Sequence, residues 1–122
     1  KNGVKTGLVS ASPRIIVDAV LDNVGAELFP FSISSDDVER TKPHPDAYLK
    51  AAQLTNSAIE NCLVFEDSLT GVGAATSSGA WLVAVPHLVH VDESERVRVI
   101  KSLEQLNFTK VQELYKDFSI VI

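Results

Sequence analysis

Hydrophobic residues gather in short runs along the chain, and longer segments with apolar residues at helical spacing separate these runs. The runs at 5–9, 29–34, 62–65 and 81–85 are mostly apolar and are bounded by polar or turn-forming residues. Runs of this length and composition predict β-strands. The run at 62–65 is apolar throughout, which predicts a strand buried on both faces.

The segments between these runs predict helices. One begins near Pro13, which suits a first helical turn, and ends near Gly25. A second runs from about Pro45 through Leu54, and a third covers 69–78 and ends at Gly79. The first helix is expected to bury an apolar face made of Ile15, Ile16, Ala19, Val20 and Val24.

The third predicted helix contains Gly71 and Gly73, although glycine destabilises a helix interior. We therefore expect the sheet or a ligand to approach this helix closely. After Pro86 the pattern weakens. Residues 94–106 are interpreted as a helix with a solvated charged face, and the tail at 111–122 mixes helical spacing with a terminal apolar run.

Strands that alternate with helices predict right-handed βαβ units and therefore an α/β fold with a mostly parallel sheet. The chain has 122 residues, of which 45% are hydrophobic, enough for one core and one domain. A formal net charge of −5 argues against a nucleic-acid-binding surface. No apolar stretch reaches membrane-spanning length and no signal peptide is visible, so the expected location is the cytoplasm.

The lone cysteine, Cys62, excludes an intramolecular disulfide and is interpreted as a buried strand residue. The three histidines lack the spacing of a metal site.

Candidate chemistry begins with the acidic pair Glu66-Asp67, which follows the apolar run at 62–65 and precedes the third helix. The carboxyl ends of parallel strands are where open α/β sheets bind ligands, and carboxylate oxygens suit Mg²⁺. The alternative is a helix start at which Asp67 or Ser68 only caps the helix and Glu66 is solvated.

Two upstream segments favour the metal interpretation. Ser10 ends the first predicted strand, and Lys42 stands in the sequence Lys-Pro-His-Pro-Asp just before the second helix. Taken alone, Ser10 could be a helix cap and Lys42 a surface lysine. A strand-end hydroxyl, a lysine and an acidic pair in this order resemble the haloacid dehalogenase-like (HAD) phosphohydrolase superfamily. The Lys-Pro-x-Pro-Asp and Glu-Asp-Ser-x-x-Gly forms resemble its subgroup of sugar-phosphate phosphatases and β-phosphoglucomutase.

The resemblance, which covers about residues 4–86, implies a three-layer α/β/α Rossmann-like HAD core and assigns roles to single residues. Ser10 and the Ala11 backbone amide would bind a phosphoryl oxygen, and Lys42 would bind the same phosphate and the nucleophile. Asp67 would bind Mg²⁺ directly, and Glu66 would bind it directly or through water. Ser68 would orient the acidic loop.

Four further polar residues have two interpretations each. Ser12 and Arg14 lie just past Ser10, where family members can contact substrate, but a first helical turn explains them equally well. Asp36 and Asp37 form a second acidic pair, although Ser-Ser-Asp-Asp is a common turn composition.

One family motif is absent. The family's nucleophile is the first Asp of an Asp-x-Asp motif, and no such motif occurs in these 122 residues, which begin with Lys1 and contain no Met. We expect residues 1–122 to be the C-terminal part of a HAD-like core, inactive alone. An upstream segment of the same protein would carry the nucleophile strand, which lies centrally in the family's sheet, and the cap domain.

The function implied for the parent protein is a Mg²⁺-dependent phosphatase acting on a small phosphorylated metabolite, with a sugar phosphate favoured, through an aspartyl-phosphate. The alternatives are a phosphomutase of the β-phosphoglucomutase type and a non-catalytic, degenerate HAD-like binding domain. A receiver domain is disfavoured, because receivers place their acidic pair before the lysine, whereas here Ser10 and Lys42 come first.

Overall fold

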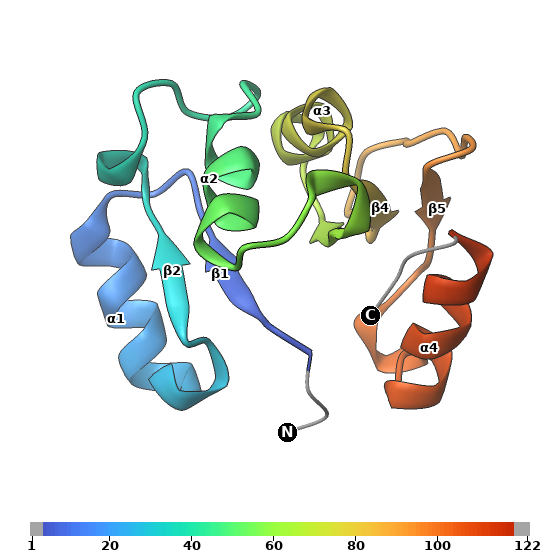
Figure 1. Cartoon of the computed structure of the whole chain (residues 1–122), viewed down its shortest axis with the longest axis horizontal. Coiled ribbons are helices and arrows are strands. Elements are labelled where there is room, and N and C mark those ends of the chain that lie inside the picture. The colour runs from blue at the N-terminus through green and yellow to red at the C-terminus, as the bar shows by residue number, and fades with distance from the viewer. Residues whose placement is uncertain (1–3, 119–122) are drawn as a thin grey trace.

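The structure is a computed structural model that describes residues 4–118 (Figure 1). Strands and helices alternate along most of the chain. The order is β1 (Gly7–Val9), α1 (Arg14–Val24), β2 (Phe31–Ile33), α2 (Asp46–Leu54), β3 (Leu63–Glu66), α3 (Leu69–Ser78), β4 (Trp81–Ala84), β5 (Val97–Val99) and α4 (Phe108–Asp117). Single 3₁₀ turns occur at Ala26–Leu28, Ser35–Asp37, Ile59–Asn61 and Leu103–Gln105.

The strands form two parallel sheets. β1 pairs with β2 in the register Leu8 to Ser32, and β3 pairs with β4, which pairs with β5. Within residues 4–118, no strand ladder joins β1 to β3. The α/β fold with parallel strands is confirmed.

Helices cover both faces of the larger sheet. Successive side chains of a strand point to opposite faces, so neighbouring residues of β4 belong to different cores. Leu82 packs with Tyr48 of α2 and with Ala74 of α3, whereas Val83 packs with Phe118 at the end of α4. The sheet is therefore the middle of three layers, with α2 and α3 on one face and α4 on the other.

α3 begins and ends as its sequence predicts. The Ser68 side chain accepts a hydrogen bond from the Gly71 N–H at 3.1 Å and caps the first turn. Gly79 has a φ of 91° and ends the helix in a left-handed conformation. The close approach expected from glycine is found at Gly71, where an added Cβ would overlap the Glu66 carboxylate. At Gly73 an added Cβ would meet only the Pro43 Cβ, at 3.5 Å.

The predicted helix over 94–106 is wrong. Val97 and Val99 form β5, which pairs with β4 in parallel, because β-branched residues fit a half-buried strand. Arg96, which precedes β5, and Arg98, which lies in it, do not form a solvated face. The Arg96 guanidinium lies 4.0 Å from the centre of the Trp81 ring, and Arg98 lies 5.0 Å from the centre of the Phe118 ring.

Two smaller expectations need correction, and a third, for the tail, is confirmed in part. In α1 only Val17 is buried, whereas Ile16, Val20 and Val24 are 50%, 45% and 50% exposed, so the expected apolar face does not lie in the core. Cys62 is only partly buried and precedes β3 rather than lying in it. The tail is helical as far as Asp117, and its apolar run at 120–122 lies outside the described residues.

No helix in the described part of the chain is both long and apolar enough to cross a membrane.

Candidate active site

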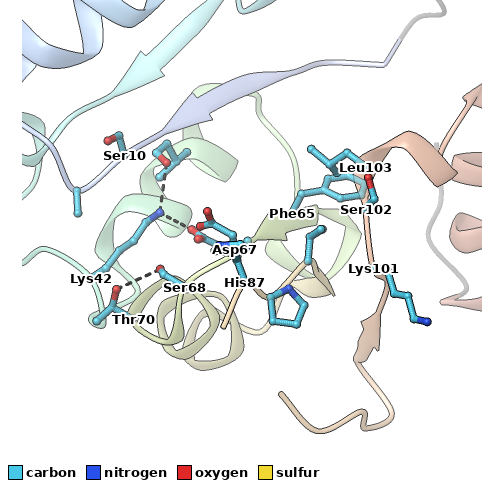
Figure 2. A pocket seen from close by; sticks show the side chains of 15 residues that line it. Ser10, Lys42, Phe65, Asp67, Ser68, Thr70, His87, Lys101, Ser102 and Leu103 are labelled. Atoms are coloured by element: carbon cyan, nitrogen blue, oxygen red, sulfur yellow. Dashed lines mark hydrogen bonds and ion pairs between the residues drawn. The ribbon is translucent and has the colours of Figure 1, made fainter. Parts of the chain in front are cut away.

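All of the candidate residues except Ser12 and Arg14 converge at the carboxyl ends of β1 and β3. A cavity of about 690 Å³ opens there, and Figure 2 shows Ser10, Lys42 and Asp67 around it. These residues come from three separate segments: the turn after β1, the loop before α2 and the end of β3. The parallel strands explain this convergence, because their carboxyl ends meet at the same edge of the fold.

Ser10 stands in the turn that leaves β1. Its N–H donates to the Ile33 carbonyl at 2.9 Å, which extends the pairing with β2 by one residue. Its Oγ accepts a hydrogen bond from the Ser12 N–H at 3.0 Å. A serine hydroxyl that accepts in this way retains its own proton for donation. Ser10 can therefore still donate to an anion in the cavity, and the exposed Ala11 lies beside it.

Lys42 joins the two sheets. Its Nζ donates to the Val9 carbonyl at the end of β1, at 3.2 Å, and to Glu66 Oε2 at the end of β3. The lysine side chain is only 8% exposed. An ammonium group held by a carbonyl and a carboxylate at a cavity wall is a fixed positive charge, suited to an anionic ligand.

Glu66 is buried and its carboxylate points to the interior. Oε2 accepts hydrogen bonds from the Lys42 ammonium and from the Tyr48 hydroxyl, and the carboxylate lies over Gly71. Burial, followed by the charge of Glu66, raises the pKa of the Tyr48 hydroxyl far above its usual value. Tyr48 therefore remains a donor to Glu66. Tyr48 lies within the second predicted helix, and sequence reasoning missed its role; the available signal was that a buried tyrosine hydroxyl requires a hydrogen-bond partner.

Asp67 has the opposite environment. It is the first residue after β3, it is exposed, and it lines the cavity. Since Ser68 caps α3, Asp67 is not needed for that task. Its carboxylate is thus available to a ligand in the cavity, whereas that of Glu66 is engaged inside the fold.

A magnesium ion fits this donor set only as part of a larger shell. Mg²⁺ in proteins commonly takes one or two carboxylates, with water and phosphate oxygens completing the shell. Asp67 offers one accessible carboxylate, and the neighbouring Glu66 offers one that Lys42 and Tyr48 already engage. In residues 4–118, no three His, Cys, Asp or Glu side chains lie close enough to hold a metal ion together.

Arg14 and the second acidic pair stabilise the turn beside the site. The Arg14 guanidinium contacts Asp37 and donates to Ser32 Oγ at 2.6 Å, while the Arg14 N–H donates to Asp36 at 2.8 Å. Hydrogen bonds from the Ser34 N–H and hydroxyl, with that of Arg14, lower the pKa of Asp37 to about 2. These contacts agree with the turn interpretation of Asp36 and Asp37. Substrate contact by Ser12 or Arg14 stays a prediction.

The cavity is also lined by residues that sequence reasoning missed. They are His87, which follows β4, and the segment after β5 that comprises Lys101, Ser102 and Leu103. The segment 101–103 could not be recognised as part of the site, because the sequence predicted a helix over 94–106, where β5 and the loop after it are found. His44, in contrast, is exposed, and His90 contacts Asp92 at 2.6 Å on an exposed loop.

Known proteins resemble this chain in sequence. A family model described as haloacid dehalogenase-like hydrolase matches residues 1–79. Hexitol phosphatase A of Escherichia coli (strain K12) is 33% identical over 116 residues, which cover 90% of this chain and 51% of that protein. Validoxylamine A 7'-phosphate phosphatase of Streptomyces hygroscopicus subsp. limoneus is 35% identical over 83 residues, covering 67% of this chain and 39% of that protein.

Solved structures of HAD hydrolases resemble this chain in fold. A HAD family hydrolase from Deinococcus radiodurans R1, with bound phosphate and sodium, superposes with a TM-score of 0.72 at 27% identity, covering 98% of this chain and 55% of that one. A β-phosphoglucomutase from Clostridium difficile superposes with a TM-score of 0.68 at 28% identity, covering 83% and 45%. The chain thus spans about half the length of these structures. With a family model matched over most of its length, this chain belongs to the haloacid dehalogenase-like hydrolase family.

Proposed function

We propose that the protein containing this chain is a Mg²⁺-dependent phosphatase that acts on a small phosphorylated metabolite, with a sugar phosphate as the favoured class. The observation that supports this most is the convergence of Ser10, Lys42 and Asp67 on one cavity. The relatives named as phosphatases of phosphorylated metabolites support the substrate class.

The three residues divide the work of phosphoryl transfer. Transfer of a phosphoryl group requires stabilisation of negative charge on its oxygens, which donors, cations and metal ions supply. Ser10 and the Ala11 amide donate hydrogen bonds to the phosphoryl oxygens, and the Lys42 ammonium neutralises part of their charge. Asp67, with Glu66 behind it, holds Mg²⁺, which supplies further charge neutralisation when bound.

The attacking group is proposed to come from outside this chain. A strand bearing Asp-x-Asp, placed between β1 and β3, would bring an aspartate to the edge at which Ser10 and Lys42 lie. Two observations support this position: β1 and β3 share no ladder in residues 4–118, and Lys42 contacts the ends of both strands. The aspartate carboxylate would attack phosphorus and the P–O bond to the metabolite would break, so that the metabolite leaves as an alcohol with a proton from the second Asp of the motif. Water would then hydrolyse the aspartyl-phosphate to inorganic phosphate and restore the carboxylate.

The alternative within the same chemistry is a phosphomutase, which the likeness to a β-phosphoglucomutase structure supports. Product analysis of the full-length protein separates the two. Release of inorganic phosphate without isomerised sugar phosphate identifies the phosphatase, and isomerised product identifies the mutase. The absence of both, with a panel of sugar phosphates, favours the non-catalytic alternative.

The site assignment is tested by Asp67→Asn and Lys42→Met in the full-length protein. Asp67→Asn should lower Mg²⁺ affinity and phosphatase rate together, because it removes the accessible carboxylate.

Lys42→Met keeps the apolar stem and should lower turnover by about 10² to 10³-fold, as expected when one charge-stabilising donor is lost. Steady-state kinetics at varied Mg²⁺ concentration measures both.

Asp92→Asn and Lys116→Met are matched controls, because both residues are exposed and do not line the cavity. Thermal unfolding of each variant identifies losses of activity that arise from loss of the fold. Wild-type rates in both site variants would remove the assignment of this cavity as the active site.

A further inference from the structure

Tyr48 belongs to a buried polar cluster with Lys42 and Glu66, yet the phosphatase chemistry above gives it no task. The tyrosine is only 6% exposed and projects from α2, whereas Lys42 precedes that helix and Glu66 ends β3. Its hydroxyl donates to Glu66 Oε2, the same oxygen that accepts the hydrogen bond from Lys42.

Tyr48 contacts both charged partners at once. The Lys42 Nζ lies 5.1 Å from the centre of the tyrosine ring, within the range of a cation–π interaction, while the hydroxyl binds the carboxylate. A lysine side chain and a glutamate side chain have many rotamers, so an ion pair between them does not alone define where either group lies. The rigid ring of Tyr48 is held in the core beside Ala74 and Val64. It therefore restricts the rotamers of both the Lys42 and the Glu66 side chains.

Glu66 is joined directly to Asp67, and Lys42 reaches the end of β1. Rotation of the Glu66 carboxylate, one residue away from Asp67 along the chain, would therefore break the hydrogen bond that holds Lys42 beside the cavity. The geometry points to Tyr48 as a positioning residue, which fixes Glu66 through its hydroxyl and Lys42 through its ring so that Lys42 and Asp67 face one anion-binding cavity. The catalytic consequence of this positioning rests on the proposed phosphatase function, whereas the positioning itself does not.

Tyr48→Phe in the full-length protein removes the hydroxyl and retains the ring. Without that hydrogen bond, Lys42 is the remaining donor to the buried oxygen and is drawn toward Glu66, away from the Val9 carbonyl and the cavity. Loss of a hydrogen bond to a charged group predicts that affinity for Mg²⁺, for inorganic phosphate or for both falls about tenfold. Titration calorimetry with each probe alone measures this without reference to activity.

Tyr115→Phe is the matched control. It removes a hydroxyl from the only other tyrosine of the chain, on α4, where Tyr115 packs on the opposite face of the sheet and does not line the cavity. We expect this variant to bind both probes as the wild type does. Tyr115→Phe should melt near the wild type, whereas Tyr48→Phe should melt at a lower temperature but remain folded at the assay temperature, because it loses a hydrogen bond to a buried carboxylate.

A double-mutant cycle with Glu66→Gln separates positioning from packing. If the Tyr48 hydroxyl acts through the Glu66 carboxylate, adding Tyr48→Phe to Glu66→Gln should change probe affinity by much less than tenfold. A purely structural role would give the same further loss in both backgrounds, and this additive result would overturn the inference.

The other possible outcomes also support or overturn the positioning role of Tyr48. Unchanged affinity for both probes in Tyr48→Phe would overturn the inference, and so would a Tyr48→Phe protein that fails to fold while Tyr115→Phe folds, because the hydroxyl would then act on stability. A wild type that hydrolyses no phosphate ester, but whose probe affinity falls in Tyr48→Phe alone, would reject the proposed function and leave the positioning role supported.

Discussion

At the scale of single residues, Glu66 and Asp67 are neighbours with opposite tasks. Successive side chains of a strand point to opposite faces, and Glu66 is the last residue of β3. Its carboxylate points toward α2 and α3, where Lys42 and Tyr48 bind it, whereas Asp67 leaves the strand and lines the cavity. The pair therefore divides into one carboxylate held inside the fold and one exposed at the cavity.

The two glycines of α3 predict opposite effects of the same substitution. Gly71→Ala should lower the free energy of unfolding by about 1–3 kcal/mol, because its Cβ would overlap the Glu66 carboxylate. Gly73→Ala should raise it by up to about 1 kcal/mol, because its Cβ makes an ordinary contact with Pro43 at 3.5 Å and alanine favours a helix. Urea unfolding of the two variants measures both changes. Equal effects would contradict the placement of Glu66 over Gly71.

At the scale of elements, a turn beside the site is joined to α1 by charge. Ser34 and Asp37 form a reciprocal capping box in the turn after β2, and Asp37 also contacts the Arg14 side chain at the start of α1. The sequence Ser-Ser-Asp-Asp predicted a turn, but its contact with Arg14 depends on two segments meeting in space.

This turn predicts a pH dependence. The folded pKa of Asp37, about 2, lies below its ordinary value of 3.8, so its contribution to stability is complete above about pH 4 and is lost as the pH falls toward 2. The Asp37 side chain is 32% exposed, so we expect a contribution of about 1 kcal/mol. Asp37→Asn should be less stable than the wild type by this amount near neutral pH, and the difference should shrink on acidification.

Urea unfolding at several pH values measures that difference, with Asp22→Asn, at an exposed position of α1, as the control. A difference between Asp37→Asn and the wild type that stays constant with pH would exclude the carboxylate as its source.

Phe118, at the end of α4, is the most deeply buried contact between this helix and the sheet, beside Leu114 and Tyr115. Phe118 is fully buried, and its ring stacks on Trp81 with centroids 4.6 Å apart. Phe118→Ala should therefore lower the free energy of unfolding by about 3–5 kcal/mol, as for other large-to-small core substitutions. Phe108→Ala, at the exposed start of α4, is the control and should cost far less. Thermal or urea unfolding compares the two, and similar losses would argue against this packing.

At the scale of the whole molecule, the polar contacts of Lys42 join two sheets that share no strand ladder in the described residues. An unpaired strand edge inside a fold leaves backbone groups without hydrogen-bond partners. The proposed Asp-x-Asp strand would satisfy these groups and bring the nucleophile to the cavity in one step.

Hydrogen exchange tests this arrangement. In the full-length protein, backbone amides of β1 and β3 should exchange much more slowly than in the chain of residues 1–122 alone. Amides of β4, which already pairs with strands on both sides, should differ far less and serve as the internal reference. Equal exchange of β1 in the two proteins would argue against a strand in the gap.

Much of the candidate site was predictable because its residues lie in short sequence motifs at the ends of strands and the starts of helices. The strands at 5–9 and 62–65, the helix at 69–78, and the motifs around Ser10, Lys42 and Glu66-Asp67 are recognisable from short stretches. The helix predicted over 94–106 failed because its apolar residues suit a strand once β4 lies beside them, and burial against a neighbour overrides a weak local pattern.

The sequence by itself determined the α/β alternation, the strand-end polar residues and the family resemblance, since periodicity and short motifs carry them. Only the tertiary structure decided that Glu66 points inward and Asp67 outward, that Tyr48 joins Lys42 on one carboxylate oxygen, and that Arg14 contacts Asp37. These contacts unite residues far apart in the chain, and their geometry depends on which strand faces which helix, which no local pattern specifies.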